Sequence, residues 1–282
     1  MDKDTIKRLI IEYQQFVANI TLIEREIHLS HQLNYVFVGL RRAGKSYLMY
    51  QQIQSLLNDG HQPEEILYFN FEDDRLVNLT VEDLDLIKVS YEELYPHKPI
   101  FFLDEIQIVE HWEKFARRLA DQQYRVYITG SNAKMLSAEI ATTLGGRYIV
   151  QNVYPFSFSE FLKASKIEIG PTWYYKNRTE IVRTFSDYFS YGGLPELMLI
   201  ETIEKRQWLS NLFNKIFFGD LITRYSIRND LAMKVLIRKL AESVKQPSSF
   251  NRLTNIVSTT GAKVSTDTII DYLNFCLLYT SP

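Results

Sequence analysis

Short apolar runs alternate with longer amphipathic segments through the first half of the chain. The runs suit strands buried on both faces of a parallel sheet, and they cover residues 35–38, 66–71, 100–103 and 125–128. A further strand is expected in 144–150, after two glycines. Helical spacing of apolar residues is found in the other segments, at 4–29, 47–57, 81–95 and 112–120. This alternation predicts an α/β fold with a doubly wound parallel sheet and a ligand site at the carboxyl ends of its strands.

The first apolar run leads into a glycine-rich loop. Residues 39–46 fit the P-loop pattern G-x-x-x-x-G-K-[ST], and a helical segment follows. The glycines let backbone N–H groups converge on a phosphate, Lys45 can reach the β- and γ-phosphates, and Ser46 can bind Mg²⁺. The alternative is a glycine turn that precedes a helix by chance. We expect ATP to contact nine residues: Gly39, Leu40, Arg41, Arg42, Ala43, Gly44, Lys45, Ser46 and Tyr47.

Two carboxylates follow the third apolar run. Asp104 and Glu105 come directly after residues 100–103, in the Walker B pattern. Asp104 is expected to hold Mg²⁺, usually through water, and Glu105 to polarise the water that attacks the γ-phosphate. The alternative is a strand that ends in solvated acids. The second run ends in a similar acidic group, Glu72 to Asp74.

Four further residues are candidates for the same site. Ser131 and Asn132 follow the fourth run, where a polar group can sense the γ-phosphate or cap the next helix. Arg147 can neutralise γ-phosphate charge on its own nucleotide or on a neighbouring subunit's, or it is a salt-bridged arginine in a surface turn. Arg25 either lies near the nucleotide or belongs to a helix packed across the domain.

Several segments, in this order and spacing, resemble the AAA+ ATPases of a large prokaryotic family whose members are known mainly as ATP-binding proteins. They are GLRRAGKS, FNFEDDRL, FFLDEIQ, ITGSNAKML, LGGRY, YPFSFSEFL and YGGLPEL. The resemblance implies the AAA+ type of P-loop fold, with a helical lid after it. It also implies Walker roles for Lys45, Ser46, Asp104 and Glu105, a sensor at Ser131 or Asn132, and an arginine finger at Arg147. The resemblance implies a chemical activity, ATP binding and hydrolysis, but it does not assign a cellular role.

The remaining sequence predicts three domains. Residues 1–165 form the nucleotide-binding domain, 166–230 the helical lid or linker, and 231–282 an incomplete winged-helix domain. In the lid, Gly192-Gly193 is a candidate hinge and Gly219 a second break. The last domain contains three helical segments with short turns, typical of a helix-turn-helix. We expect the open reading frame to be truncated, with a non-native tail after about residue 275.

Composition limits the classes of function. The 282 residues carry a net charge of −2, which argues against a general polyanion binder. The single cysteine, Cys276, excludes an intrachain disulfide and a cysteine metal cluster. No apolar run approaches the roughly 18 residues of a membrane span, so we expect a cytoplasmic protein without membrane association.

DNA is a candidate partner of the helix-turn-helix segment. Basic residues are available for it, but Asp267 and Asp271 on the candidate recognition helix repel phosphate. A winged-helix fold used for protein contacts is the alternative. The basic residues are Lys234, Arg238, Lys239, Lys245, Arg252 and Lys263.

The leading hypothesis is therefore an ATPase that uses Mg²⁺-ATP to move a macromolecular partner. A homo-oligomer is one candidate assembly of this protein. The alternative is a nucleotide-dependent switch or DNA-binding regulator with little turnover. Glu105 favours hydrolysis, because a pure binder does not need a carboxylate after Asp104. A small-molecule kinase is disfavoured by the few arginines in 178–228.

Overall fold

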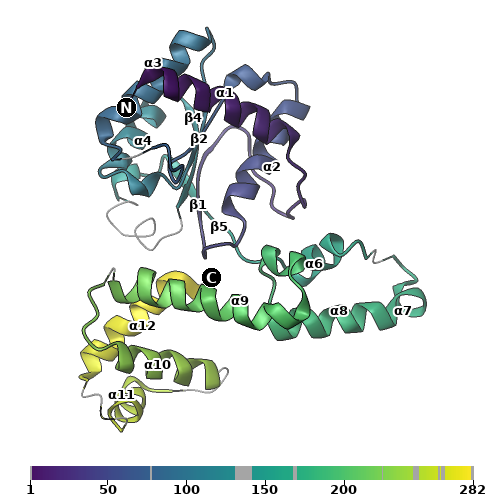
Figure 1. Cartoon of the computed structure of the whole chain (residues 1–282), viewed down its shortest axis with the longest axis vertical. Coiled ribbons are helices and arrows are strands. Elements are labelled where there is room, and N and C mark those ends of the chain that lie inside the picture. Colours follow the sequence, from purple (N-terminus) through teal and green to yellow (C-terminus); the bar gives the residue numbers. More distant parts are fainter. Residues whose placement is uncertain are drawn as a thin grey trace. The chain divides into compact units, whose positions relative to one another are not determined.

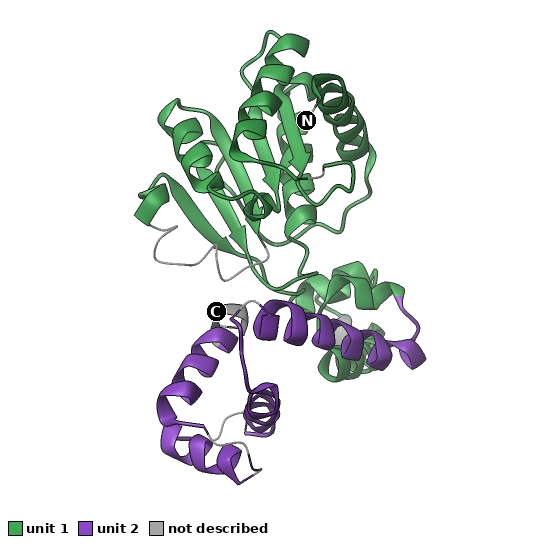
Figure 2. Cartoon of the chain, turned by 60° about the vertical axis from the view of Figure 1, so that its left-hand side comes forward, with its two compact units in different colours: residues 1–199 green, residues 200–282 purple. Residues whose placement is uncertain are grey.

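The computed structural model describes residues 2–76, 78–130, 142–167, 170–223, 225–243, 248–259, 261 and 264–280. Contacts divide the chain into two compact units, Met1–Leu199 and Ile200–Pro282 (Figure 2). The first unit contains the sheet and extends beyond the predicted boundary at residue 165. No helix among the described residues is both long enough and apolar enough to cross a bilayer.

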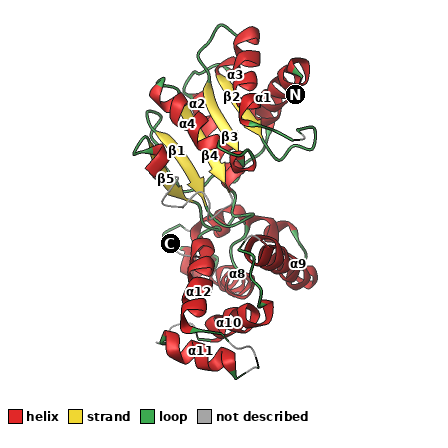
Figure 3. Cartoon of the chain, turned by 90° about the vertical axis from the view of Figure 1, so that its left-hand side faces the viewer, coloured by secondary structure: helices red, strands yellow, loops and turns green. Residues whose placement is uncertain are grey.

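The first unit is built on a five-stranded sheet that lies among helices (Figure 1). Its strands run in the order β2-β3-β4-β1-β5, and all paired strands are parallel (Figure 3). The carboxyl ends of the strands therefore meet at one edge, as the α/β prediction requires. The strands are β1 (Asn34–Val38), β2 (Ile66–Asn70), β3 (Ile100–Asp104), β4 (Arg125–Gly130) and β5 (Tyr148–Asn152).

Helices cover both faces of this sheet (Figure 3). Alternate strand residues face opposite sides, so that Phe101 packs with α3 and α4 in one buried cluster, while Phe102 packs with α2 in another. The helix α1 contributes to both clusters. This doubly wound arrangement confirms the predicted fold class. The helices concerned are α1 (Lys3–Asn19), α2 (Lys45–Asn58), α3 (Val81–Leu94) and α4 (Trp112–Asp121).

The prediction of one helix over residues 4–29 was wrong at its second half. The helix α1 ends at Asn19, and the chain continues without regular structure to residue 33. Contacts with α2 explain this change. The backbone N–H of Arg25 donates to Gln51 Oε1 at 2.7 Å, and its carbonyl accepts from Gln51 Nε2 at 3.1 Å. These side-chain bonds replace the ones that a helix would supply.

The rest of the first unit follows β5. It contains α6 (Phe158–Ala164), α7 (Trp173–Lys176), α8 (Arg178–Tyr191) and a 3₁₀ turn at Pro195–Leu199. The predicted hinge at Gly192-Gly193 comes directly after α8. Gly193 packs tightly there, because a Cβ atom on it would lie 2.2 Å from the carbonyl oxygen of Phe156. The backbone N–H of Phe156 also donates to the Gly193 carbonyl at 2.7 Å, which ties this segment to the sheet domain.

The second unit is helical. It contains α9 (Thr202–Lys215), a π-helical stretch at Ile216–Thr223, α10 (Asp230–Glu242), α11 (Phe250–Ser258) and α12 (Thr266–Thr280). The predicted break at Gly219 was wrong, because the helix continues through it while Phe217 and Leu221 hold it in the core of the unit. The three helices expected after residue 231 are present. The described part of this region contains no strand, so the winged-helix assignment is not confirmed.

Candidate functional site

The glycine-rich loop joins β1 to α2 at the carboxyl edge of the sheet. Gly39 is required by close packing, because a Cβ atom on it would lie 2.1 Å from the carbonyl oxygen of Val153. Gly44 is required by its conformation, since its φ of 96° lies in the left-handed region that side chains disfavour. The helix α2 begins at Lys45, so the N–H groups of its first turn lie next to the loop. Such a loop and helix start can bind an anion.

Lys45 reaches back over this loop. Its ammonium group donates to the carbonyl oxygens of Gly39 at 3.3 Å and Leu40 at 3.2 Å. It also lies 3.8 Å from Glu105 Oε1. Burial lowers the pKa of Lys45, whereas the nearby carboxylates of Glu105 and Asp104 act in the opposite direction. Two residues predicted for the site, 60 positions apart in the sequence, thus meet beside the loop.

Asp104 is buried at the end of β3, and three hydroxyl groups hold its carboxylate. Tyr68 donates to Oδ2 at 2.7 Å, Thr129 donates to Oδ1, and Ser46 bonds to the same carboxyl group. Burial raises the pKa of Asp104, and these hydroxyl groups oppose that rise by bonding the ionised form. Burial also raises the pKa of Tyr68, which keeps its hydroxyl a donor. The side chain of Asp104 is therefore held in one orientation.

Glu105 has an unusual backbone conformation, with a φ of 56° and a ψ of 35°. A non-glycine residue in this left-handed region needs support from its surroundings. Thr129 supplies it, since its hydroxyl oxygen accepts a hydrogen bond from the Glu105 N–H at 2.9 Å while donating to Asp104. The Glu105 carboxylate accepts a bond from Gln107 and faces Lys45. One threonine thus orients both acids.

Thr129 was not among the residues predicted for the site. The prediction of a polar group at the end of the fourth strand was placed on Ser131 and Asn132, which lie outside the described residues. Thr129 precedes them within β4, which is paired with β3. The signal that could have revealed it is a hydroxyl residue near the end of an apolar strand, next to the strand that carries the acids.

The donor set fits Mg²⁺. Ser46 and Asp104 bring a hydroxyl and a carboxylate together, and both are hard oxygen ligands of the kind that this ion takes. No cluster of three or more His, Cys, Asp or Glu residues within the described residues could hold a metal ion. Magnesium commonly binds through one or two protein groups, with phosphates and water completing its shell. The residues present suit that arrangement.

The other loop positions contact acids from two different segments. Arg41 Nη1 lies 3.8 Å from Glu72 Oε1, after β2, and Arg42 pairs with Glu196 in the 3₁₀ turn. Arg42 also has a left-handed φ of 65°. The Tyr47 side chain is exposed. These contacts link the loop to the acidic strand end and to the segment after α8.

Arg25 lies against the loop, although it belongs to neither β1 nor α2. Its Nη1 donates to the carbonyl oxygen of Ala43 at 3.1 Å. The same nitrogen is 3.3 Å from the position that a Cβ atom on Gly44 would take. Of the two sequence-based interpretations of Arg25, the structure therefore supports a place beside the phosphate-binding loop.

Arg147 lies at the amino end of the strands, whereas the glycine-rich loop of the same chain lies at their carboxyl end. Arg147 precedes β5, in which Tyr148 pairs with Asn34, whereas the loop follows Val38 at the other end of β1. These positions are six residues apart along the strand direction, or about 20 Å. Arg147 Nε instead lies 2.5 Å from Asp121 Oδ1, at the end of α4. The structure does not bring Arg147 to the P-loop of the same chain.

Several basic residues of the candidate DNA-binding face have partners within the chain. On α10, Arg238 and Lys239 lie 3.0 Å and 3.4 Å from the carboxylate oxygens of Glu242. Lys234 lies over the ring of Phe218, 5.4 Å from its centroid. Two of the predicted basic residues, Lys245 and Lys263, are outside the described residues. Of the predicted basic residues, four lie in the described part of the chain. Lys234, Arg238 and Lys239 have these side-chain contacts within the chain.

Residues 31–162 match a family model described as an AAA domain. An uncharacterized protein of Methanocaldococcus jannaschii is 32% identical over 277 residues, which cover 97% of this chain and 61% of the relative. An uncharacterized protein of Haemophilus influenzae is 32% identical over 265 residues, which cover 90% of this chain and 64% of the relative. The chain thus spans less than two thirds of the length of these curated relatives.

Solved structures are also similar over most of the chain, at low scores. DnaA from Aquifex aeolicus, bound to AMPPCP, has a TM-score of 0.36 and 14% identity, covering 95% of this chain and 86% of DnaA. Orc1 from Aeropyrum pernix, in complex with DNA, has a TM-score of 0.35 and 13% identity, covering 98% of this chain and 83% of Orc1. Scores this low add nothing to the assignment of the site.

Proposed function

We propose that this chain binds Mg²⁺-ATP and hydrolyses it to ADP and phosphate, which agrees with the AAA domain model that matches residues 31–162. The AAA domain is a nucleotide-binding P-loop ATPase fold. One observation carries the step from binding to hydrolysis. Lys45, which is suited to bind phosphate, lies 3.8 Å from Glu105, which is suited to activate water.

In this proposal the residues of the site divide the reaction among them. The loop N–H groups and Lys45 hold the β- and γ-phosphates, and Ser46 and Asp104 hold Mg²⁺, which supplies charge neutralisation at the phosphates. Glu105 orients the attacking water and accepts its proton. Thr129 keeps the backbone of Glu105 in its left-handed conformation.

We further propose that hydrolysis drives a conformational change on a macromolecular partner. Steady-state phosphate release, measured with and without duplex DNA, tests both parts. Turnover that requires Mg²⁺ supports the ATPase, and stimulation by DNA identifies the partner class. Tight ATP binding with no release under either condition would favour the alternative, a nucleotide-dependent switch or DNA-binding regulator.

We predict that Thr129→Val slows ATP turnover by about tenfold or more while changing ATP affinity by less than about threefold. Valine keeps the shape of threonine but removes the hydroxyl that bonds Asp104 and the N–H of Glu105. A hydrogen bond to a charged group contributes about 1.5–3 kcal/mol, and about 1.4 kcal/mol corresponds to tenfold in rate. Turnover and fluorescent-ATP affinity are measured on the same preparation.

Tyr127→Phe is the matched control for Thr129→Val. It also removes a buried hydroxyl from β4, but this one bonds Gln52 at 3.3 Å, away from both acids. Its turnover should stay close to that of the unmodified protein. Equal losses in the two variants would mean that Thr129 acts only through the stability of β4.

Arg147 remains a candidate arginine finger for a neighbouring subunit's nucleotide. We predict that ATPase activity per subunit rises with protein concentration, because hydrolysis then needs assembly. Mixing Arg147→Ala with Lys45→Ala subunits should restore some turnover, since an intact Arg147 can face an intact P-loop in mixed interfaces. Activity that is independent of dilution, with an inactive mixture, would assign Arg147 to a structural pair with Asp121.

A further inference from the structure

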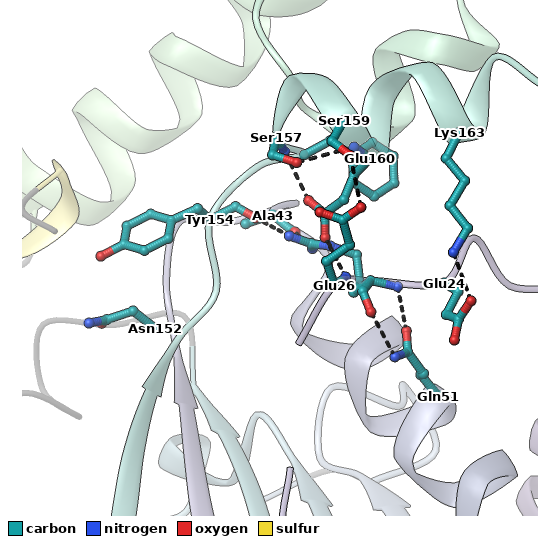
Figure 4. Close-up of polar contacts among 12 residues, drawn as sticks. Glu24, Glu26, Ala43, Gln51, Asn152, Tyr154, Ser157, Ser159, Glu160 and Lys163 are labelled. Carbon is teal, nitrogen blue, oxygen red and sulfur yellow. Dashed lines mark hydrogen bonds and ion pairs between the residues drawn. The ribbon is translucent and has the colours of Figure 1, made fainter. Parts of the chain in front are cut away.

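Arg25 is a buried arginine in a segment without regular structure, and only 6% of its surface is exposed. Its guanidinium group makes three hydrogen bonds to three different segments of the first unit. Nε donates to Glu160 Oε1 at 2.8 Å, Nη1 to the Ala43 carbonyl at 3.1 Å, and Nη2 to the Tyr154 carbonyl at 2.8 Å (Figure 4). The group also lies 5.1 Å from the centroid of the Phe156 ring. The guanidinium is thus held on several sides.

Glu160 is fixed as firmly as its partner. It closes a capping box at the start of α6, in which its Oε2 accepts from the Ser157 N–H at 2.9 Å. Its Oε1 accepts from the Glu26 N–H at 2.9 Å as well as from Arg25. Burial raises the pKa of Glu160, but the bonds from Arg25 and from these N–H groups outweigh that effect and hold it below its usual value. Glu160 is therefore a carboxylate at neutral pH.

The bond to Ala43 has a direct consequence for the phosphate-binding loop. In a trans peptide the carbonyl and the following N–H lie in one plane and point in opposite directions. The Ala43 carbonyl points toward Arg25, so the N–H of Gly44 points away from it. This N–H is next to the start of α2, where the anion-binding groups of the loop gather. The bond from Arg25 thus favours this orientation of the Ala43–Gly44 amide.

A structural role alone does not explain why these positions are charged. Burying two charges away from water is costly. Apolar residues of similar volume at the same positions often make a protein equally stable or more stable. An apolar side chain at position 25 cannot donate to the Ala43 carbonyl. The surface already provides another link between the same two segments, since Lys163 Nζ on α6 lies 2.7 Å from Glu24 Oε2. Figure 4 shows that pair apart from the contacts of Glu160.

We propose that Arg25 is a positioning residue for the P-loop, which orients the Ala43–Gly44 peptide toward the phosphates and is itself held in place by Glu160. This inference rests on the proposed function, because it assigns Arg25 to the binding of the polyphosphate part of ATP. Arg25 acts through the loop and is not a catalytic residue.

The test compares Arg25→Lys with Lys163→Met in the full chain. Lysine keeps the charge but has one nitrogen, which cannot reproduce three bonds of fixed geometry. Affinities are measured by titration with a fluorescent ATP analogue and by competition with inorganic pyrophosphate, and thermal unfolding is followed without nucleotide. We expect Arg25→Lys to weaken ATP and pyrophosphate by the same factor, about tenfold. Turnover at saturating ATP should stay within about twofold, and Lys163→Met should change neither affinity.

Several results would overturn this assignment. Unchanged ATP affinity in Arg25→Lys would do so, as would a loss for ATP with no loss for pyrophosphate, which would place Arg25 at the nucleoside. Equal losses in Arg25→Lys and Lys163→Met would mean that any link between these segments serves. If Arg25→Lys does not fold, Glu160→Gln replaces it. Its amide oxygen can still accept from Arg25 but carries no charge, so we expect smaller losses that are again equal for ATP and pyrophosphate. A chain of natural sequence that binds neither ligand would instead overturn the proposed function itself.

Discussion

The Lys45→Ala variant will bind ATP at least about a hundredfold more weakly than the unmodified chain. Lys45 is the cation that can contact both the β- and γ-phosphates from its position over the loop. Two charge-assisted hydrogen bonds of about 1.5–3 kcal/mol each account for a loss of that size. The cost of burying the ammonium group is already met in the folded chain, so no such cost opposes binding. Fluorescent-ATP titration measures the affinity.

Lys98→Ala is the control for this variant. Lys98 also donates to two backbone carbonyls, those of Gln122 and Gln123, at 3.1 Å and 2.9 Å. It lies before β3, at the opposite end of that strand from the acids. Its removal should leave ATP affinity unchanged. If Lys45→Ala binds ATP as well as Lys98→Ala does, while both unfold at the same temperature, the assignment of the P-loop is wrong.

The Glu105→Gln variant will bind ATP normally and hydrolyse it about 10²–10⁴ times more slowly, the range typical for loss of a general base. The amide has the shape of the carboxylate but cannot accept a proton from water. Its oxygen can still accept the bond from Gln107, so the local structure is retained. Loss of a negative charge near the phosphates leaves ATP affinity equal or slightly higher. Single-turnover phosphate release and ATP titration measure the two effects separately.

Glu72→Gln is the matched control for Glu105→Gln. Glu72 follows β2, the strand next to β3, and it faces Arg41 rather than Lys45. We expect its turnover to remain close to that of the unmodified chain. Normal turnover in Glu105→Gln would move the role of general base to another acid at this edge. Glu72 and Asp73, at the end of the neighbouring strand β2, would be the first candidates.

The position of the phosphate-binding loop could be predicted because its cause is local. A buried strand, two glycines at fixed spacing and a helix start are consecutive in the sequence. Local backbone conformation and packing explain why each of these residue types is needed. The same holds for Asp104 and Glu105, since two acids directly after an apolar run mark the carboxyl end of a buried strand. The parallel sheet then follows from the alternation of strands and helices, and it brings both motifs to one edge.

The residues that hold the site in place could not be predicted from the sequence, because their contacts join segments that are far apart in the chain. Thr129 reaches the two acids only because β4 pairs with β3 in one register, and a slip of one residue would turn its hydroxyl to the other face. The position of Arg147 was decided in the same way. The sequence left open the chain's own nucleotide, a neighbouring subunit's nucleotide and a surface salt bridge, and parallel pairing of β5 with β1 places Arg147 at the amino end of the strands, away from its own P-loop.

The sequence by itself determined the α/β fold, the glycine-rich loop and the paired acids, since their periodicity and spacing reflect backbone geometry within a few residues. Only the tertiary structure decided that residues 20–29 leave the helix and that Arg25 reaches Ala43. The partner that orients Arg25, Glu160, is 135 positions away in the sequence. The physical reason is that a buried guanidinium is stable only where opposite charge and hydrogen-bond acceptors surround it. That environment is assembled from distant segments when the chain folds.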